Sequence, residues 1–192
     1  MTDDRPRYGV VAIALHWLVM ALIIASWALG LYMVDLPLSP QKLKYFSWHK
    51  WLGVTIFLIA LCRVTWRVVL PAPPPPDSMP SWQRVAMGVS HLLLYLLPIA
   101  IPLTGWLFSS ASGVPTVYLG WFQIPDLIAN DKLFAEQLRQ AHFSLNVMLF
   151  AIVCIHVAAA LKHHVFDRDE VLVRMLPYLR RPGELRWRRT SK

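Results

Sequence analysis

Long runs of apolar residues alternate with shorter polar segments along this 192-residue chain. A bilayer core about 30 Å thick is crossed by roughly 20 apolar residues of α-helix. Four stretches are long and apolar enough to cross it, and they cover residues 10–33, 49–70, 86–108 and 142–163. The pattern therefore predicts an all-α integral membrane protein, a bundle of four transmembrane helices.

The segments between these stretches carry patterns of their own. Residues 71–76 read Pro-Ala-Pro-Pro-Pro-Pro, which predicts a stiff, extended linker. The segment 109–139 is the longest connection, and its apolar spacing over 127–138 predicts a short helix lying on the membrane surface. Pro98 and Pro102 fall inside the third stretch, where we expect them to kink the helix.

Composition agrees with a membrane protein, since 56% of the residues are hydrophobic and only 16% are charged. The four spans leave no room for a separate soluble domain, so residues 1–180 are expected to form one membrane domain, followed by a basic tail at 181–192. The first stretch is too long for a signal-peptide core and should stay in the mature protein. Cys62 and Cys154 both lie in apolar stretches, where we expect them to serve as small residues of the core.

The net charge of +8 does not indicate nucleic-acid binding, because the basic residues collect at the ends of apolar stretches. If the N-terminus is cytoplasmic, most Lys and Arg residues fall on the cytoplasmic side, and five fall outside. The positive-inside rule then predicts a multi-pass protein of the bacterial inner membrane with both termini cytoplasmic. The inside set is Arg5, Arg7, Arg63, Arg67, Arg84, Lys162, Arg168, Arg174, Arg180, Arg181, Arg186, Arg188, Arg189 and Lys192; the outside set is Lys42, Lys44, Lys50, Lys132 and Arg139.

Histidines recur within the apolar stretches, at positions 16, 49, 91, 142 and 156. Burying a polar ring in hydrocarbon is costly, so each is a candidate for function. His142 and His156 are 14 residues apart, nearly four helical turns, so they share one helix face about 21 Å apart. Because successive helices run in opposite directions, His16 reaches the depth of His156, and His49 that of His142. The sequence therefore predicts two histidine pairs stacked across the membrane.

Each pair suits a haem iron, because imidazole is a good axial ligand and two axial histidines favour electron transfer over oxygen binding. The chain has no C-x-x-C-H motif, so two non-covalent, bis-histidine haem b groups are predicted. Gly53, one turn after His49, would leave room for a flat macrocycle. Zinc or copper would need ligands that are clustered, and a proton relay would need carboxylates within the spans, where this sequence has none.

Three other histidines stay open to more than one interpretation. His91, near the inner start of the third stretch, competes with His16 as the inner ligand, or hydrogen-bonds a haem propionate or a quinone oxygen. His163 and His164 follow the last span at the inner surface, where solvent exposure and quinone or proton handling are equally compatible with the sequence.

The chain resembles the bacterial cytochrome b-561 family, the four-helix di-haem proteins, over almost its whole length. That resemblance implies haem ligation by one histidine each from the first and second helices and two from the fourth, namely His16, His49, His142 and His156. The inner haem then falls between His16 and His156, and the outer haem between His49 and His142. The segments that carry the resemblance are Ile13–Trp17, His49 with Gly53, Arg63 and Arg67, His91–Tyr95, His142, His156–His164 and Leu172–Pro177.

Within that family the chain is similar to superoxide oxidases, which pass electrons from periplasmic superoxide to ubiquinone. The resemblance implies a superoxide:ubiquinone oxidoreductase. Lys50 and Arg139, with Lys132, are then candidates for steering superoxide, since local positive potential attracts an anion. Lys162 and His163 are candidates for the quinone site.

Two other functions stay open. One is a quinol- or cytochrome-coupled carrier of the same architecture that serves a periplasmic redox partner. The other is a haem-free membrane module that scaffolds partners. The sequence also leaves the oligomeric state open, with a homodimer among the options.

Overall fold

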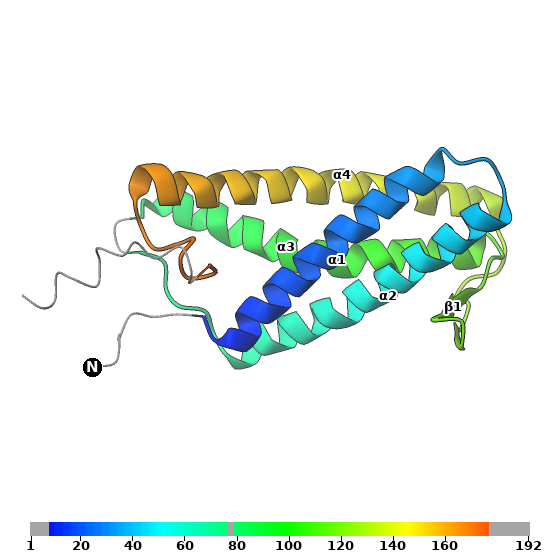
Figure 1. Cartoon of the computed structure of the whole chain (residues 1–192), viewed down its shortest axis with the longest axis horizontal. Helices are drawn as coiled ribbons and strands as arrows, with labels where there is room; N and C mark the ends of the chain where they lie inside the picture. The colour runs from blue at the N-terminus through cyan, green and yellow to red at the C-terminus, as the bar shows by residue number, and fades with distance from the viewer. Residues whose placement is uncertain (1–7, 77–78, 177–192) are drawn as a thin grey trace, which may run out of the picture.

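The computed structural model describes residues 8–76 and 79–176 of the chain. Within these residues four long helices dominate, and a short antiparallel hairpin connects the last two of them (Figure 1). The predicted basic tail at 181–192 lies outside the described residues. The elements are α1 (Val10–Val34), α2 (Pro40–Val69), α3 (Ser81–Ala111), β1 (Thr116–Tyr118), β2 (Phe122–Ile124), α4 (Lys132–Lys162) and the π-helical turn η1 (His163–Asp167).

All four helices are long and apolar enough to cross a bilayer, which agrees with the predicted four-span membrane bundle. Each predicted span falls within one helix to within a residue at its ends. The helices α2 and α4 start well before the apolar stretches because each has its own N-cap. The Ser39 hydroxyl accepts a hydrogen bond from the Lys42 backbone N–H, and the Asp131 carboxylate accepts from those of Leu133 and Phe134.

The predicted surface helix over 127–138 is wrong. Residues 127–131 are not helical, and the remaining apolar positions belong to the first turns of α4. The Asp131 cap starts that helix, and nothing interrupts it before the membrane span. Ala135 and Leu138 are instead buried against Ala111 at the end of α3, so the spacing that indicated a surface helix reflects packing between two long helices.

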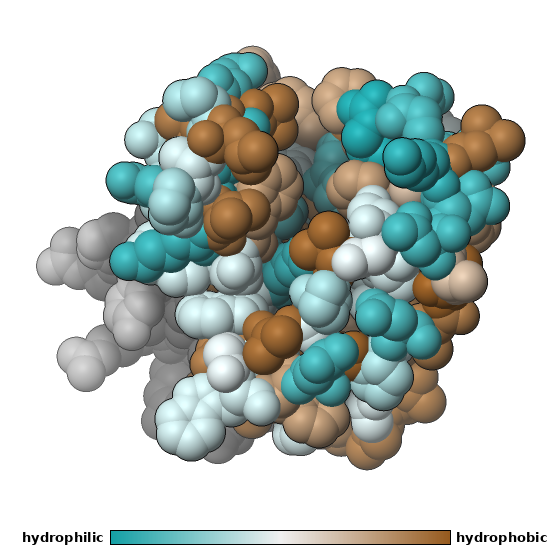
Figure 2. All heavy atoms as spheres, turned by 90° about the vertical axis from the view of Figure 1, so that its right-hand side faces the viewer, coloured by the Kyte–Doolittle hydropathy of each residue, from teal (hydrophilic) through white to brown (hydrophobic). Residues whose placement is uncertain are grey.

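Each helix packs against its neighbour in the chain, α1 on α2, α2 on α3 and α3 on α4. Figure 1 shows that the start of α1, the end of α2, the start of α3 and the end of α4 meet at one end of the bundle, here called the basic end. The hairpin and the α1–α2 connection lie at the opposite end, here called the hairpin end. Hydrophilic residues are spread across the hairpin end (Figure 2), whereas the helix sides expose large apolar residues such as Leu31, Leu58 and Ile155.

A central apolar cluster lies about midway along every helix. Leu149, for example, is midway between His142 and His156 on α4, and Ile56 lies midway along α2. The cluster therefore separates the histidines of the two ends. Its buried members are Val19, Ile23, Ile56, Leu97, Ile101 and Leu149.

Two smaller predictions have clear outcomes. Residues 71–76 form no helix or strand, as expected for a proline-rich linker. Cys62 and Cys154 are free thiols but are exposed on the helix sides, so the expectation that they fill the core is wrong. Both face outward because the core side of each helix is occupied by the central cluster and the histidine layers.

Candidate functional site

His49 on α2 and His142 on α4 face each other near the hairpin end. Their ring centroids are 6.3 Å apart, and the rings are nearly perpendicular, with an interplanar angle of 80°. Both side chains are half-buried and line a cavity that reaches between all four helices. Gly53 and Asn146 also line this cavity, and Asn146 accepts a hydrogen bond from the Trp27 indole N–H at 2.8 Å.

Backbone carbonyls fix both of these rings. The Nδ1–H of His49 donates to the Ser26 carbonyl at 3.2 Å, and that of His142 donates to the Ile101 carbonyl at 3.0 Å. The hydroxyls of Ser26 and Thr104 lie 3.3 Å and 3.2 Å from the same nitrogens. Since a carbonyl only accepts, Nδ1 carries the proton in both rings, and each Nε2 keeps a free lone pair.

A glycine stands four residues after each of these carbonyls. A Cβ at Gly30 would lie 3.3 Å from the His49 Cε1, and a Cβ at Gly105 would lie 3.1 Å from the His142 Cε1. Each ring reaches a carbonyl of the neighbouring helix because the residue one turn along has no side chain. The sequence reasoning missed this device, although a glycine in each of two spans rich in large residues is a signal that could have pointed to it.

The basic end is built differently, from three histidine rings. The ring centroids of His16 and His156 are 6.3 Å apart, and those of His91 and His156 are 5.5 Å apart. The ring of His16 is held by a side chain, since the Arg63 Nη2 donates to its Nδ1 at 3.1 Å. The Arg63 guanidinium also stacks on the Tyr95 ring at 4.7 Å.

The spacing of the rings fits a metal held between two imidazoles. Metal–nitrogen bonds are about 2 Å long and each nitrogen lies about 1 Å from its ring centroid, so two opposed ligands place their centroids about 6 Å apart. Both predicted pairs show 6.3 Å. A Cβ on Gly53, beside His49, would meet no atom within 4 Å, which leaves room for a planar group. Two opposed imidazoles suit haem iron. Haem ligation by these four histidines stays a prediction.

The two candidate superoxide-steering residues both lie near the hairpin end. The Lys50 ammonium donates to the carbonyls of Val114 at 3.3 Å and Pro115 at 3.2 Å, which ties α2 to the loop that leads into the hairpin. Arg139 is exposed and forms an ion pair with Glu136 one turn earlier on α4. The charge of Arg139 is therefore paired with a carboxylate, whereas the Lys50 ammonium is held by two carbonyls and has the Asp126 carboxylate within electrostatic reach.

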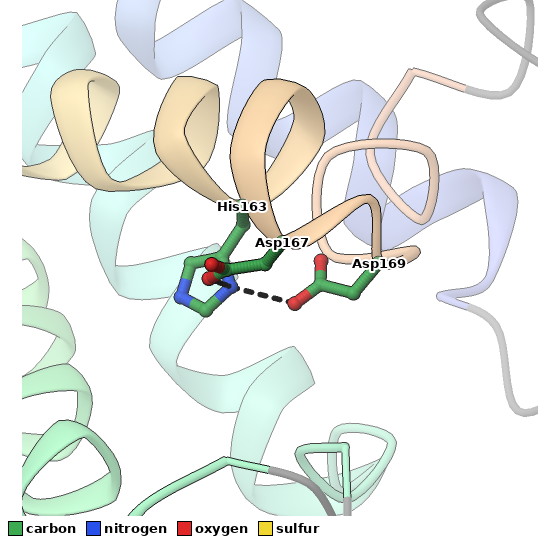
Figure 3. A group of neighbouring side chains, drawn as sticks. All are labelled: His163, Asp167 and Asp169. Atoms are coloured by element: carbon green, nitrogen blue, oxygen red, sulfur yellow. Dashed lines mark hydrogen bonds and ion pairs between the residues drawn. The ribbon is translucent and has the colours of Figure 1, made fainter.

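The candidate quinone residues lie where α4 passes into η1 (Figure 3). The His163 Nδ1 is 2.6 Å from an Asp169 carboxylate oxygen and 3.0 Å from one of Asp167. Lys162 forms an ion pair with Asp167 at 2.6 Å. The two carboxylates bind one nitrogen of the His163 ring and leave Nε2 for another partner. The sequence reasoning did not single out either aspartate, because their approach depends on the π-helical turn.

Comparison with known proteins points to the same family that the sequence resembles. The model of the prokaryotic cytochrome b561 family matches residues 7–178. The chain is 37% identical to cytochrome b561 homolog 2 of Escherichia coli (strain K12), over 91% of this chain and 94% of that protein. It is 29% identical to the probable superoxide oxidase CybB of Yersinia pestis, over 89% of this chain and 96% of that protein. The chain is also 26% identical to cytochrome b561 homolog 1 of the same Escherichia coli strain, over 89% of this chain and 97% of that protein.

Proposed function

The chain belongs to the prokaryotic cytochrome b561 family, and from this premise we propose that it is a di-haem membrane cytochrome that oxidises superoxide and reduces ubiquinone. One observation carries the di-haem part of the proposal: two histidine pairs with the same 6.3 Å spacing lie at opposite ends of one bundle. Haem b groups in both positions would supply one-electron chemistry at two depths in the membrane.

The four histidines have defined roles in this proposal. His49 and His142 hold the outer haem through Nε2, because carbonyls bind their Nδ1–H groups. His16 and His156 hold the inner haem. The apolar cluster between the two layers excludes water and keeps the carriers apart.

The orientation follows from the charges. The described part of the basic end carries five arginines and one lysine, so the positive-inside rule predicts that this end is cytoplasmic and that the hairpin end is periplasmic. Residues 1–180 then form one domain of the bacterial inner membrane, in contact with lipid, with both termini cytoplasmic. The basic residues of this end are Arg63, Arg67, Arg84, Lys162, Arg168 and Arg174.

At the periplasmic end we assign the attraction of superoxide chiefly to Lys50. Lys50 follows His49 directly in the chain. Its ammonium is held beside the hairpin by two carbonyls, which do not neutralise its charge. Loss of one electron converts superoxide to oxygen, and no proton is needed. Support for this substrate comes from the name of the Yersinia pestis relative.

At the cytoplasmic end Lys162 and His163 are proposed to serve ubiquinone. Two superoxide ions, one quinone and two protons give two oxygen molecules and one quinol, so this end must deliver two protons for each quinol. The Asp169 carboxylate accepts a hydrogen bond from the His163 Nδ1–H, which leaves Nε2 free to take up a proton from the cytoplasm and pass it to a quinone oxygen. Lys162 forms an ion pair with Asp167 and keeps further N–H donors for a quinone oxygen.

The test combines haem quantitation with superoxide kinetics. The detergent-purified protein should contain two haem b per chain, become reduced on mixing with superoxide, and yield quinol when ubiquinone is present. Lys50→Gln should slow reduction about tenfold and flatten its dependence on salt, because screening acts on the attraction that the charge provides. Lys44→Gln is the matched control, since it removes the same charge from an exposed position on the first turns of α2.

The other outcomes are equally informative. Two haems that do not respond to superoxide would favour a quinol- or cytochrome-coupled carrier for a periplasmic redox partner. The relative at 37% identity, which is named only as a cytochrome b561 homolog, gives that alternative its support. Protein without haem would refute both and leave a scaffolding module.

A further inference from the structure

Buried hydrogen-bond donors without partners are concentrated at the basic end. In the part of the chain that the structure describes, three buried side-chain atoms lack a hydrogen-bond partner: the Arg67 Nη1, the Arg174 Nε and the Ser90 Oγ. Leaving such a group unpaired costs about 1–3 kcal/mol, and more when it is charged. Two of the three belong to guanidinium groups, which only donate, so the missing partner is an acceptor and suits an anion.

These residues come from separate elements of the basic end. Arg67 lies one turn beyond Arg63 on α2, towards the basic end, and Ser90 precedes His91 on α3. The charge of Arg67 acts on His91, so these two side chains lie within electrostatic reach. Arg174 belongs to segment 168–176, which folds back onto the bundle after η1.

Two hydrogen bonds hold that returning segment in place. The Trp17 indole N–H donates to the Met175 carbonyl at 3.0 Å, and the Arg174 Nη1 donates to the Pro74 carbonyl at 2.7 Å. Tyr8, just before α1, is close to both arginines. Burial raises the pKa of its phenol, and the charges of Arg67 and Arg174 act in the opposite direction. Arg67 and Arg174 are thus both within electrostatic reach of one side chain, that of Tyr8.

Arg63 gives a second, independent reason to expect an anion here. Its guanidinium donates to the His16 Nδ1, which therefore accepts and leaves the ring proton on Nε2. A neutral imidazole that binds a metal through Nε2 carries its proton on Nδ1 instead, and Nδ1 is then a donor. If His16 is an iron ligand, Arg63 must turn to another acceptor. A carboxylate close to the His16 layer would provide one.

We propose that Arg63, Arg67 and Arg174, with Ser90, bind the propionate carboxylates of the inner haem. This inference rests on the proposed haem sites but not on the substrate. Arginine pairs with carboxylates through two parallel hydrogen bonds, which suits two propionates entering a group of three guanidiniums. This assignment also gives segment 168–176 a role, since its return to the bundle would bring Arg174 to the end of the haem pocket.

Infrared spectroscopy can test the contact directly. The full-length holoprotein is produced with haem that carries ¹³C in its propionate carboxyl groups, and reduced-minus-oxidised difference spectra are recorded. Arg67→Gln and Arg174→Gln should each shift the ¹³C-sensitive carboxylate bands and lower the midpoint potential of the inner haem, because a positive charge that stabilises the reduced form is lost. Retention of the inner haem should fall about tenfold. Arg67→Lys should restore the potential but not the band positions, since an ammonium keeps the charge and loses the two-point geometry.

The controls separate the ways in which this idea can fail. Arg84→Gln removes a charge from the same end, where the Arg84 Nε donates to the Met79 carbonyl, and should leave the bands unchanged. If the holoprotein has two haems but none of the arginine variants moves the labelled bands, the propionate assignment is wrong. Native mass spectrometry then decides whether Arg67→Gln instead loses an anionic phospholipid. Purified protein without haem would refute the proposed function, a result that differs from either of these.

Discussion

The two histidine layers have the same ring spacing but different supports. At the hairpin end, His49 and His142 are fixed by carbonyls of the neighbouring helices, and a glycine lies beside each ring. At the basic end, His16 is held by the side chain of Arg63, and a third ring, His91, lies near His156. Backbone groups therefore fix the histidine rings at the hairpin end, whereas a charged side chain holds His16 at the basic end.

This difference has consequences for both assembly and redox chemistry. A carbonyl of a helix cannot turn away, so the hairpin-end rings keep one tautomer and one orientation whatever is bound. Arg63 can move, so the basic-end rings depend on what else the arginines bind. A carbonyl acceptor makes an imidazole a stronger donor to the oxidised metal, whereas nearby guanidinium charge favours the reduced metal.

Removing one ligand from each layer should give the largest effect. His142→Ala and His156→Ala should each lower the haem content from two to one per chain, because bis-histidine ligation needs both rings. Pyridine haemochrome assays of the purified proteins measure this directly. His49→Ala should lose the same haem as His142→Ala, and His16→Ala should lose the same haem as His156→Ala. Loss of both haems from a single substitution would show that the layers do not assemble independently.

The glycines should have the next largest effect, and only at the hairpin end. Gly105→Ala places a Cβ 3.1 Å from the His142 Cε1, which should push the ring off the Ile101 carbonyl and weaken haem binding about 10- to 100-fold. Gly30→Ala should act in the same direction but less, since its Cβ would be 3.3 Å from the His49 Cε1. Haem retention during purification is the measurement.

Gly88→Ala provides the matched control for these substitutions. A Cβ there would meet no atom within 4 Å, and the residue lies in the first turns of α3 at the basic end. It should leave both haems in place. If Gly105→Ala retains the outer haem as well as the Gly88 variant does, the fixed-ring account of the hairpin end is wrong.

The groups that hold the histidine rings also predict which of the two haems has the lower midpoint potential. The haem held by His49 and His142 should have the lower potential, by an amount on the order of tens of millivolts, because carbonyl acceptors favour its oxidised form. Electron flow from the hairpin end to the basic end is then downhill. Redox titrations of the single-haem variants give each potential separately. A lower potential at the basic end would reverse the preferred direction and argue against superoxide as the donor.

Much of this arrangement could be predicted from the sequence. Hydropathy located the four helices, and the 14-residue spacing of His142 and His156 predicted the two depths. The ring supports could not be predicted, because the contact of His142 with Ile101 joins residues 41 positions apart on different helices. Asp169 was missed for a related reason, since it reaches His163 only after a π-helical turn that no local pattern announces. The unpaired arginine atoms likewise depend on how segment 168–176 folds back.

His91 offers the finest distinction between the layers, because it decides which two of three rings act at the basic end. The His16–His156 spacing equals that of the hairpin-end pair, whereas His91 is closer to His156, at 5.5 Å. His91→Ala should therefore keep both haems and change the spectrum only slightly. His16→Ala should lose the inner haem. Haem content and the low-spin signals in electron paramagnetic resonance distinguish these results, with His164→Ala as a control at the same end.

The opposite result would have a definite physical meaning. Arg63 holds the His16 Nδ1 as an acceptor, which leaves the proton on the Nε2 that would bind iron. If His91→Ala loses the inner haem and His16→Ala keeps it, that hydrogen bond persists in the holoprotein and His91 pairs with His156. Arg63 would then position His16 instead of a propionate, while Arg67 and Arg174 would still need their acceptor. The two substitutions therefore test the ligand assignment and the movement of Arg63 together.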